Sequence, residues 1–213
     1  MDRQVAIRQL IDVADAYLGR FDGPGIPMVR DGVARWKDGP LQDVEPHRID
    51  AVDHVDTALA WMKRDGKTAL ADAIVAAMPF LAWGAYDPYP REEIGEKYAT
   101  GHAATILIGQ HGHIGADDFD LGLFVFAPDT LYRDHCHAAP ELYAPMTGPH
   151  GWRFASGRPL EWRPAHQPVW NEAWAQHAFK SGAIPFFCLY AWTRDVAIPA
   201  KMILEPDWAA LEN

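Results

Sequence analysis

The residues best suited to chemistry lie in one stretch, LYRDHCHAAPELYAPMTG, which covers 131–148. His135 and His137 are two residues apart, so in a β-strand both imidazoles point to the same face. Pro140 interrupts that strand and allows a turn that brings Glu141 back toward the histidines. Two imidazoles and a carboxylate that converge on one point suit a borderline divalent ion. The stretch therefore predicts a metal site.

A fourth ligand must come from another part of the chain, and His177, in WAQHAFKSG, is the best candidate. The spacing HxH, then three residues and Glu141, then six residues and Gly148, resembles the first signature of the cupin superfamily. In that superfamily both histidines and the glutamate bind metal. The chain departs from the pattern at Asp129, where a glycine is usual. It also lacks the proline-x-glycine that normally precedes the last histidine of the second signature.

A narrower resemblance is to the cupin-type dimethylsulfoniopropionate lyases. It is carried by five residues of the first motif, namely Tyr132, His135, His137, Glu141 and Tyr143. The later stretch HAFKSGAIPFFCLYAWTRD, 177–195, resembles the segment of that family that carries the last metal histidine and a Trp-containing strand. A helical region before a C-terminal cupin is also similar to the longer members. The first 95 or so residues agree in architecture and carry no family motif.

This resemblance implies a β-elimination that splits dimethylsulfoniopropionate into dimethyl sulfide and acrylate. A divalent ion on the substrate carboxylate would stabilise the negative charge that develops when the neighbouring proton is removed. Tyr143 is the family-matched base; a phenol with an ordinary pKa of about 10 is a poor base at neutral pH, so it needs the nearby ion. Tyr132 could orient the substrate or act as a second base. Trp192 could face the sulfonium through its π-system.

Other interpretations remain open at this point. Tyr143, Tyr132 and Trp192 could each be ordinary residues of the barrel core. The protein could be another metallocupin, an oxygenase or isomerase that acts on a different small carboxylate. It could also be a ligand-sensing cupin with no enzymatic activity. Three histidines and a carboxylate accept Zn, Fe, Mn, Ni or Co, so the spacing does not select the metal.

Composition excludes several classes of function. The 213 residues include nine Trp, and the formal net charge is −10, which argues against a nucleic-acid partner. No stretch is long and apolar enough to span a bilayer, so we expect no membrane partner. The charged start, MDRQVAIRQLIDVADAYL, has no signal-peptide apolar region, and a cytoplasmic protein is expected. The partner that we expect is a small carboxylate substrate.

The elements that must position the motif follow from hydrophobic spacing. A helix is predicted up to Leu18, an ordered loop over 24–49, and helices over 49–64 and 67–80. Short β-type runs follow residue 95 and predict a barrel; they cover 104–109, 121–128, 141–148 and 183–192. The fold class is therefore mainly β with α: a C-terminal cupin barrel (double-stranded β-helix or jelly roll), 96–213, preceded by an N-terminal helical region, 1–95.

Two further expectations concern side chains around this frame. The HGH repeat at 111–113 sits between glycines and predicts an exposed turn rather than a second ligand pair. His102, His150 and His166 are expected at the surface or around the site without binding metal. The amphipathic N-terminal helices could cover a face of the barrel or a partner subunit, so a homodimer stays open.

Overall fold

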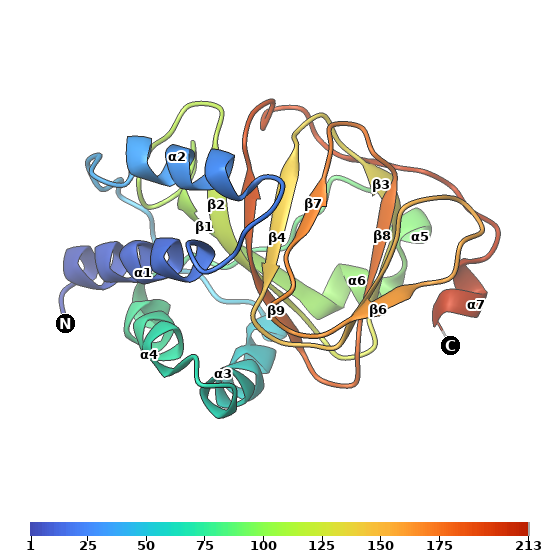
Figure 1. Cartoon of the computed structure of the whole chain (residues 1–213), viewed down its shortest axis with the longest axis horizontal. Coiled ribbons are helices and arrows are strands. Elements are labelled where there is room, and N and C mark those ends of the chain that lie inside the picture. Colours follow the sequence, from blue (N-terminus) through green and yellow to red (C-terminus); the bar gives the residue numbers. More distant parts are fainter. Residues whose placement is uncertain (213) are drawn as a thin grey trace.

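The chain folds into a layer of helices followed by two β-sheets, as a computed structural model that describes residues 1–212 shows (Figure 1). The helices are α1 (Arg3–Leu18), α2 (Ile26–Trp36), α3 (His54–Arg64), α4 (Thr68–Ala77), α5 (Arg91–Ile94), α6 (Glu96–Gly101) and α7 (Trp208–Glu212), with 3₁₀ turns η1 (Asp50–Asp53) and η2 (Met78–Phe80). The predicted helices over 49–64 and 67–80 are confirmed as η1 with α3 and as α4 with η2. The division into regions at residue 95 stays a prediction.

The strands form two five-stranded antiparallel sheets that face each other. They are β1 (His102–Ile108), β2 (Asp120–Phe126), β3 (Leu131–Cys136), β4 (Glu141–Pro145), β5 (His150–Arg153), β6 (Glu161–Arg163), β7 (Val169–Asn171), β8 (His177–Ser181), β9 (Phe186–Trp192) and β10 (Lys201–Met202). One sheet has the order β1-β2-β9-β4-β7 and the other β10-β3-β8-β5-β6. The four predicted strand runs correspond to β1, β2, β4 and β9. The predicted jelly-roll barrel is confirmed.

Strand β9 shows why the sequences of these strands are continuous apolar runs. Successive side chains in a strand point to opposite faces. Phe187 and Leu189 pack into a core shared with the helices, whereas Phe186 and Cys188 pack into a second, aromatic core between the sheets. Because both faces are buried, no polar residue alternates with the apolar ones. The helices thus cover the outer face of the first sheet and leave its inner face to the aromatic core.

Residues 24–49 do not form only a loop, and this prediction was wrong. Helix α2 occupies part of the range and buries Ile26, Val29 and Val33 completely or nearly so. Pro27 in the first helical turn misled the interpretation, since proline at that position removes only a backbone N–H that no helical carbonyl would accept. The spacing of the buried residues was the signal for a helix.

The HGH segment is only partly the exposed turn that its glycines suggest. His111 is exposed, but His113 is fully buried. Leu41 forms a β-bridge with Ile114, and the backbone N–H of Gln42 donates to the His113 carbonyl, so an N-terminal segment covers this side of the turn. The prediction of an exposed turn was therefore wrong for His113.

Three other histidines, His102, His150 and His166, are held in place by neighbouring groups. His102 is buried and its ring stacks on Tyr98, with ring centroids 4.0 Å apart. His150 is fully buried, and His166 contacts the Tyr17 hydroxyl at 2.9 Å beneath helix α1. Of the two positions expected for these histidines, at the surface or around the site, burial excludes the surface for His102 and His150.

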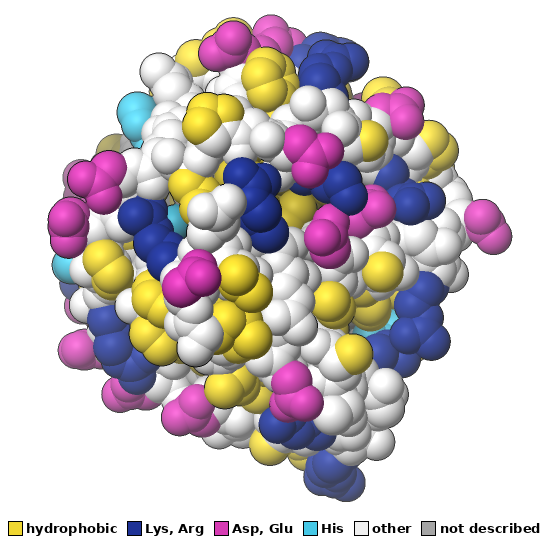
Figure 2. Space-filling view, turned by 90° about the vertical axis from the view of Figure 1, so that its left-hand side faces the viewer, with side chains coloured by type: hydrophobic (Ala, Val, Ile, Leu, Met, Phe, Trp, Pro, Cys, Tyr) yellow, Lys and Arg dark blue, Asp and Glu magenta, His cyan; other side chains and the backbone are white. Residues whose placement is uncertain are grey.

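Figure 2 faces the helical side of the molecule, where acidic and basic side chains are interspersed with hydrophobic ones. Met28 and Val75 are among the large hydrophobic side chains that the structure leaves exposed on helices. Within residues 1–212, no helix is both long enough and apolar enough to cross a membrane.

Candidate metal centre and its cavity

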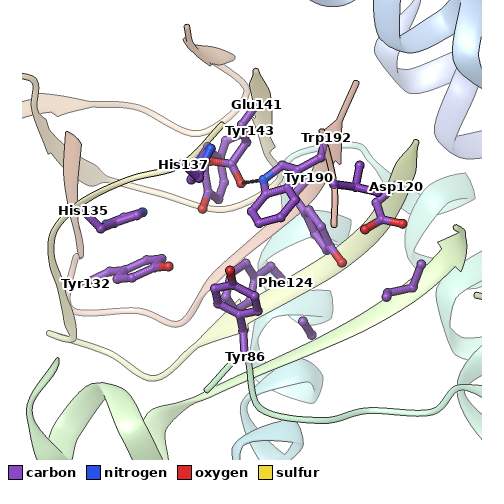
Figure 3. A pocket seen from close by; sticks show the side chains of 13 residues that line it. Tyr86, Asp120, Phe124, Tyr132, His135, His137, Glu141, Tyr143, Tyr190 and Trp192 are labelled. Carbon is purple, nitrogen blue, oxygen red and sulfur yellow. Dashed lines mark hydrogen bonds and ion pairs between the residues drawn. The ribbon is translucent and has the colours of Figure 1, made fainter. Parts of the chain in front are cut away.

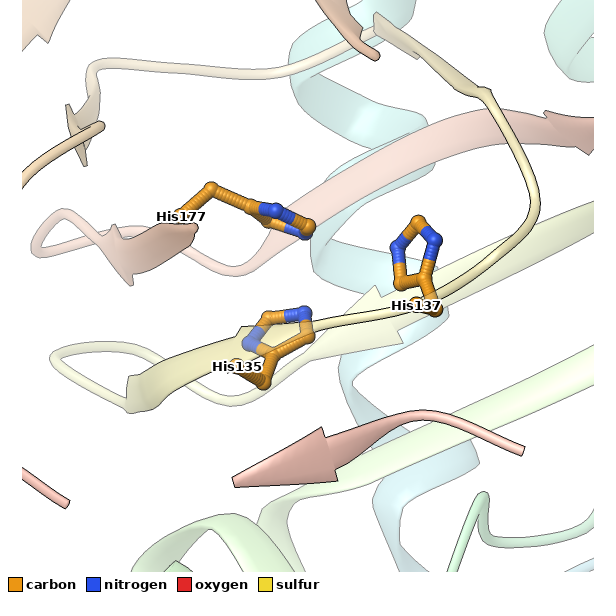
Figure 4. Close-up of side chains that lie close together, drawn as sticks. All are labelled: His135, His137 and His177. Atoms are coloured by element: carbon orange, nitrogen blue, oxygen red, sulfur yellow. The ribbon is translucent and has the colours of Figure 1, made fainter. Parts of the chain in front are cut away.

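Three histidines meet between the two sheets (Figure 4). His135 on β3 lies directly opposite His177 on β8, and their ring centroids are 4.1 Å apart. His137 follows the end of β3, where the chain leaves this sheet for β4 in the other one. One nitrogen of each ring lies within 4.8 Å of the others, and all three residues are buried. The structure thus brings together the histidines that the sequence singled out.

Each ring is oriented by its own local backbone. The Nδ1 atom of each histidine contacts a carbonyl oxygen two residues away: Arg133 for His135 at 2.8 Å, Ala139 for His137 at 2.6 Å, and Ala175 for His177 at 2.9 Å. Since a carbonyl only accepts, each Nδ1 carries the hydrogen, and the Nε2 atoms of His135 and His177 keep a free lone pair, whereas that of His137 contacts Glu141. This is the arrangement that orients histidine ligands around metal ions.

The Nε2 atoms have few other partners. Those of His135 and His177 are buried and have no hydrogen-bond partner within residues 1–212. Burying a polar atom without a partner costs free energy. A divalent ion would give both nitrogens a partner, because histidine binds such ions through this lone pair. Burial, with His177 and His137 nearby, lowers the pKa of His135 well below its usual range. Its ring is therefore neutral, as metal binding requires.

Glu141 completes the donor set from the opposite sheet. Its Oε2 lies 3.1 Å from His137 Nε2 and 3.6 Å from His177 Nε2. Trp192 Nε1 donates to the other oxygen, Oε1, at 2.8 Å, and Asn171 contacts Oε2 at 3.4 Å. Burial alone would raise the pKa of Glu141, but the two histidines outweigh it and hold that pKa well below its usual range. The carboxylate is ionised and aimed at the cluster.

A β-bulge places Tyr132 on the same side as the histidines. Between Tyr132 and His135 strand β3 advances three residues while β8 advances two, from Phe179 to His177. The extra residue re-aims the strand, so that Tyr132 stacks on His135 with ring centroids 3.8 Å apart. Its hydroxyl contacts that of Tyr89 at 2.6 Å. In a regular strand two residues three apart would face opposite sides.

The cluster forms one wall of a cavity of about 150 Å³ (Figure 3). Glu141, His135 and His137 line it together with aromatic side chains that include Tyr143 and Trp192. The lining residues are Tyr86, Ala104, Ile106, Asp120, Phe124, Tyr132, His135, His137, Glu141, Tyr143, Tyr190, Trp192 and Val196. All five residues that the 131–148 motif singled out therefore line this cavity, whereas His177 belongs to the cluster but not to the lining.

Tyr143 differs from Tyr132 in its hydrogen bonding. Within residues 1–212 the Tyr143 hydroxyl has no hydrogen-bond partner, whereas that of Tyr132 is already paired with Tyr89. Burial and the nearby Glu141 carboxylate raise the pKa of Tyr143 well above its usual value. Positive charge at the histidine cluster would act in the opposite direction. The Tyr143 hydroxyl is thus unpaired in the wall of the cavity.

Two lining features had no signal in the motif. Asp120, at the start of β2, faces the same cavity as Glu141, and sequence reasoning gave it no role. The Tyr190 ring lies over Gly122 of the neighbouring strand β2. A Cβ atom at Gly122 would lie 2.5 Å from this ring and 2.2 Å from the Thr105 carbonyl oxygen. Only glycine leaves space for that ring. The alternation of β9 would have placed Tyr190 on the same face as Trp192.

Two facing antiparallel sheets with a histidine cluster between them are the architecture of a cupin, and the protein has this fold. A model of the dimethylsulfoniopropionate lyase family matches residues 33–188, and the chain belongs to that family. It is 26% identical over 172 residues to the putative dimethylsulfoniopropionate lyase DddL of Cereibacter sphaeroides, covering 78% of this chain and 69% of that protein.

Two solved structures of lyases for dimethylsulfoniopropionate (DMSP) share the fold over nearly the whole chain. A chain from the crystal structures of the DMSP lyases RdDddP and RnDddQII gives a TM-score of 0.73 at 21% identity, with 95% of this chain and 100% of that one covered. The DMSP lyase DddQ from Ruegeria pomeroyi gives 0.69 at 22% identity, with 93% and 96% covered. The helical layer is therefore part of the shared fold.

Proposed function

We propose that the protein is a metal-dependent lyase that splits dimethylsulfoniopropionate into dimethyl sulfide and acrylate. His135, His137, His177 and Glu141 are the proposed ligands, and Tyr143 is the proposed base. The observation that carries the proposal is the position of the unpaired Tyr143 hydroxyl in the same cavity as the convergent histidine nitrogens. Membership of the lyase family supports it.

The cavity matches both ends of this zwitterionic substrate. The histidine cluster suits the end that carries the carboxylate, where a bound divalent ion would supply Lewis-acid stabilisation of the developing negative charge. Aromatic faces, among them Trp192, Tyr190 and Phe124, line the remaining walls and suit the methylated sulfonium.

The reaction balances without an oxidant or reductant. Tyr143, as the phenolate, takes the proton from the carbon next to the carboxylate. The electron pair of that C–H bond becomes the second bond between the two carbons, and the C–S bond breaks with its pair leaving on sulfur. The products are neutral dimethyl sulfide, acrylate and protonated Tyr143. Tyr132 stacks on His135 and is paired with Tyr89, which suits a residue that orients rather than one that takes the proton.

The test is anaerobic incubation of metal-reconstituted protein with dimethylsulfoniopropionate, with dimethyl sulfide and acrylate measured together. We expect equal amounts of the two products. Tyr143→Phe should lower kcat by about a hundredfold or more, which is the usual contribution of a general base. Metal content should stay unchanged in this variant, since Tyr143 is not among the proposed ligands.

Tyr17→Phe is the matched control, because Tyr17 is a buried phenol that donates to the Pro145 carbonyl outside the cavity. It should retain wild-type turnover. Absence of both products would contradict the lyase assignment, and a strict requirement for oxygen would favour an oxygenase. Full activity in Tyr143→Phe would remove this residue from the role of base.

A further inference from the structure

A second carboxylate faces the cavity opposite Glu141. The register of the first sheet pairs Asp120 on β2 with Trp192 on β9, and Trp192 in turn with Glu141 on β4. Directly paired residues project to the same face of a sheet, so the two carboxylates lie on either side of Trp192 and both face inward. Figure 3 shows Asp120 at the end of the cavity away from His135. Neither the motif nor the metal site accounts for this carboxylate.

The Asp120 carboxylate has no partner of its own. Within residues 1–212 it has no hydrogen-bond donor and no ion pair, although it is half-buried. It is closely packed, because a Cβ atom at Gly109 would lie 2.0 Å from its Oδ1. Burial raises the pKa of Asp120 to about 6, with a smaller contribution from Asp118, while His111 acts in the opposite direction. At neutral pH it is therefore a mostly ionised, incompletely solvated carboxylate.

The surroundings of Asp120 suit a cation with methyl groups. Tyr190, Phe124 and Trp192 present aromatic rings on the same inner face, and rings attract soft cations through their π-faces. No Lys or Arg is among the residues that line the cavity. An anionic end group would meet an unshielded like charge there, whereas a neutral one would leave the carboxylate unpaired.

We infer that Asp120 is the counter-ion for a methylated cationic end group of the substrate, a sulfonium or a quaternary ammonium. The inference rests on the proposed function, in which the carboxylate at the other end of the substrate lies at the histidine cluster. Asp120 then determines specificity: it favours the zwitterion over carboxylates of the same shape whose other end is uncharged. It also places the C–S bond at a fixed distance from the Tyr143 end of the cavity, because the substrate is held at both ends.

The test compares two carboxylates that differ only in the charge of the far end group: 3-(trimethylammonio)propanoate and 4,4-dimethylpentanoate, whose tert-butyl end is uncharged. Their binding to metal-reconstituted protein is measured by calorimetry, so the readout does not depend on turnover. The wild type should prefer the cation. Asp120→Asn should reduce that preference by about tenfold, as expected for loss of one close charge pair in a partly desolvated site. Affinity for 4,4-dimethylpentanoate should stay within about twofold.

Asp117→Asn is the matched control, since it makes the same change three residues away at an exposed position. It should leave both affinities unchanged. Asp120→Glu keeps the charge and should keep most of the preference, which separates the role of charge from that of packing. Circular dichroism and thermal melting verify that each variant is folded.

The outcomes separate this inference from the lyase assignment. An unchanged preference in Asp120→Asn, an equal loss of affinity for both probes, or no preference in the wild type would overturn the role of Asp120. Loss of the preference in Asp120→Asn alone would support it. If that loss occurs in a protein that releases no dimethyl sulfide, the cation site stands and the lyase assignment fails.

Discussion

Glu141 owes its orientation to one neighbouring side chain. Trp192 donates its indole N–H to Oε1, which leaves Oε2 directed at His137 and His177. The indole ring also packs against the His137 ring, with centroids 4.9 Å apart. We therefore propose that Trp192 positions Glu141, in addition to the contact with the substrate cation that the resemblance suggested for it. Both roles are compatible, because the ring lines the cavity while its N–H faces the carboxylate.

Trp192→Phe should weaken metal affinity by about tenfold, because hydrogen-bond partners of metal ligands typically contribute that much. The phenyl ring still fills most of the space, but Oε1 of Glu141 loses its donor. Competition with a chelator measures the affinity. Trp170→Phe is the control, since Trp170 donates to Glu172 near the surface. Equal affinities in Trp192→Phe and wild type would show that Trp192 does not position Glu141.

At the residue scale the sequence indicated most of the site. The ligand spacing was enough to propose His135, His137, Glu141 and His177, and the structure places them together. Asp120 was missed because its importance depends on strand register: β2 and β4 are neighbours of β9, and no local pattern shows which residues of β2 lie opposite Trp192.

Strand β3 is the element on which the site is built, and its other face is held by a buried ionic network. Asp134 is fully buried and receives hydrogen bonds from Arg153 Nε at 3.0 Å, from Gln176 Nε2 at 3.0 Å and from Trp208 Nε1 at 2.9 Å. Arg153 also binds Asp207 at 2.7 Å. The network thus ties β3 to β5 and to the C-terminal segment.

Asp134→Asn should lower the free energy of unfolding by about 3 kcal/mol, because it leaves a buried guanidinium without one of its two carboxylates. Urea denaturation measures the loss. The control is Asp12→Asn, which breaks an exposed ion pair with Lys37 and should cost less than about 1 kcal/mol. A change below about 0.5 kcal/mol at Asp134 would show that Asp207 alone neutralises Arg153.

At the element scale, long apolar patterns were predictable and irregular ones were not. The burial of both faces made β9 visible as a continuous apolar run. The bulge in β3 was not predictable, because one extra residue leaves no trace in composition and is defined only by pairing with β8. Without it Tyr132 would face away from His135. Helix α2 was predicted as a loop, because the proline and glycine in its sequence suggested one although its valines have the spacing of a helix.

At the scale of the whole molecule, one core supports the barrel and the other surrounds the cavity. The helices and the outer face of the first sheet form an aliphatic core that supports the barrel. The inner core is largely aromatic and contains Tyr132, Tyr143 and Trp152. Its packing leaves a cavity beside the histidines instead of filling the barrel. Because the unpaired histidine nitrogens are costly when buried, we expect metal binding to stabilise the whole chain.

The most direct test of this account is the dependence of activity on metal content. Metal-free protein is titrated anaerobically with Zn, Fe, Mn, Ni or Co, and dimethyl sulfide release is plotted against ions bound per chain. We predict that activity is absent without metal, rises in proportion to occupancy and saturates at one ion per chain. His135→Gln should bind little metal and release little product. Undiminished activity in protein freed of metal would contradict the account.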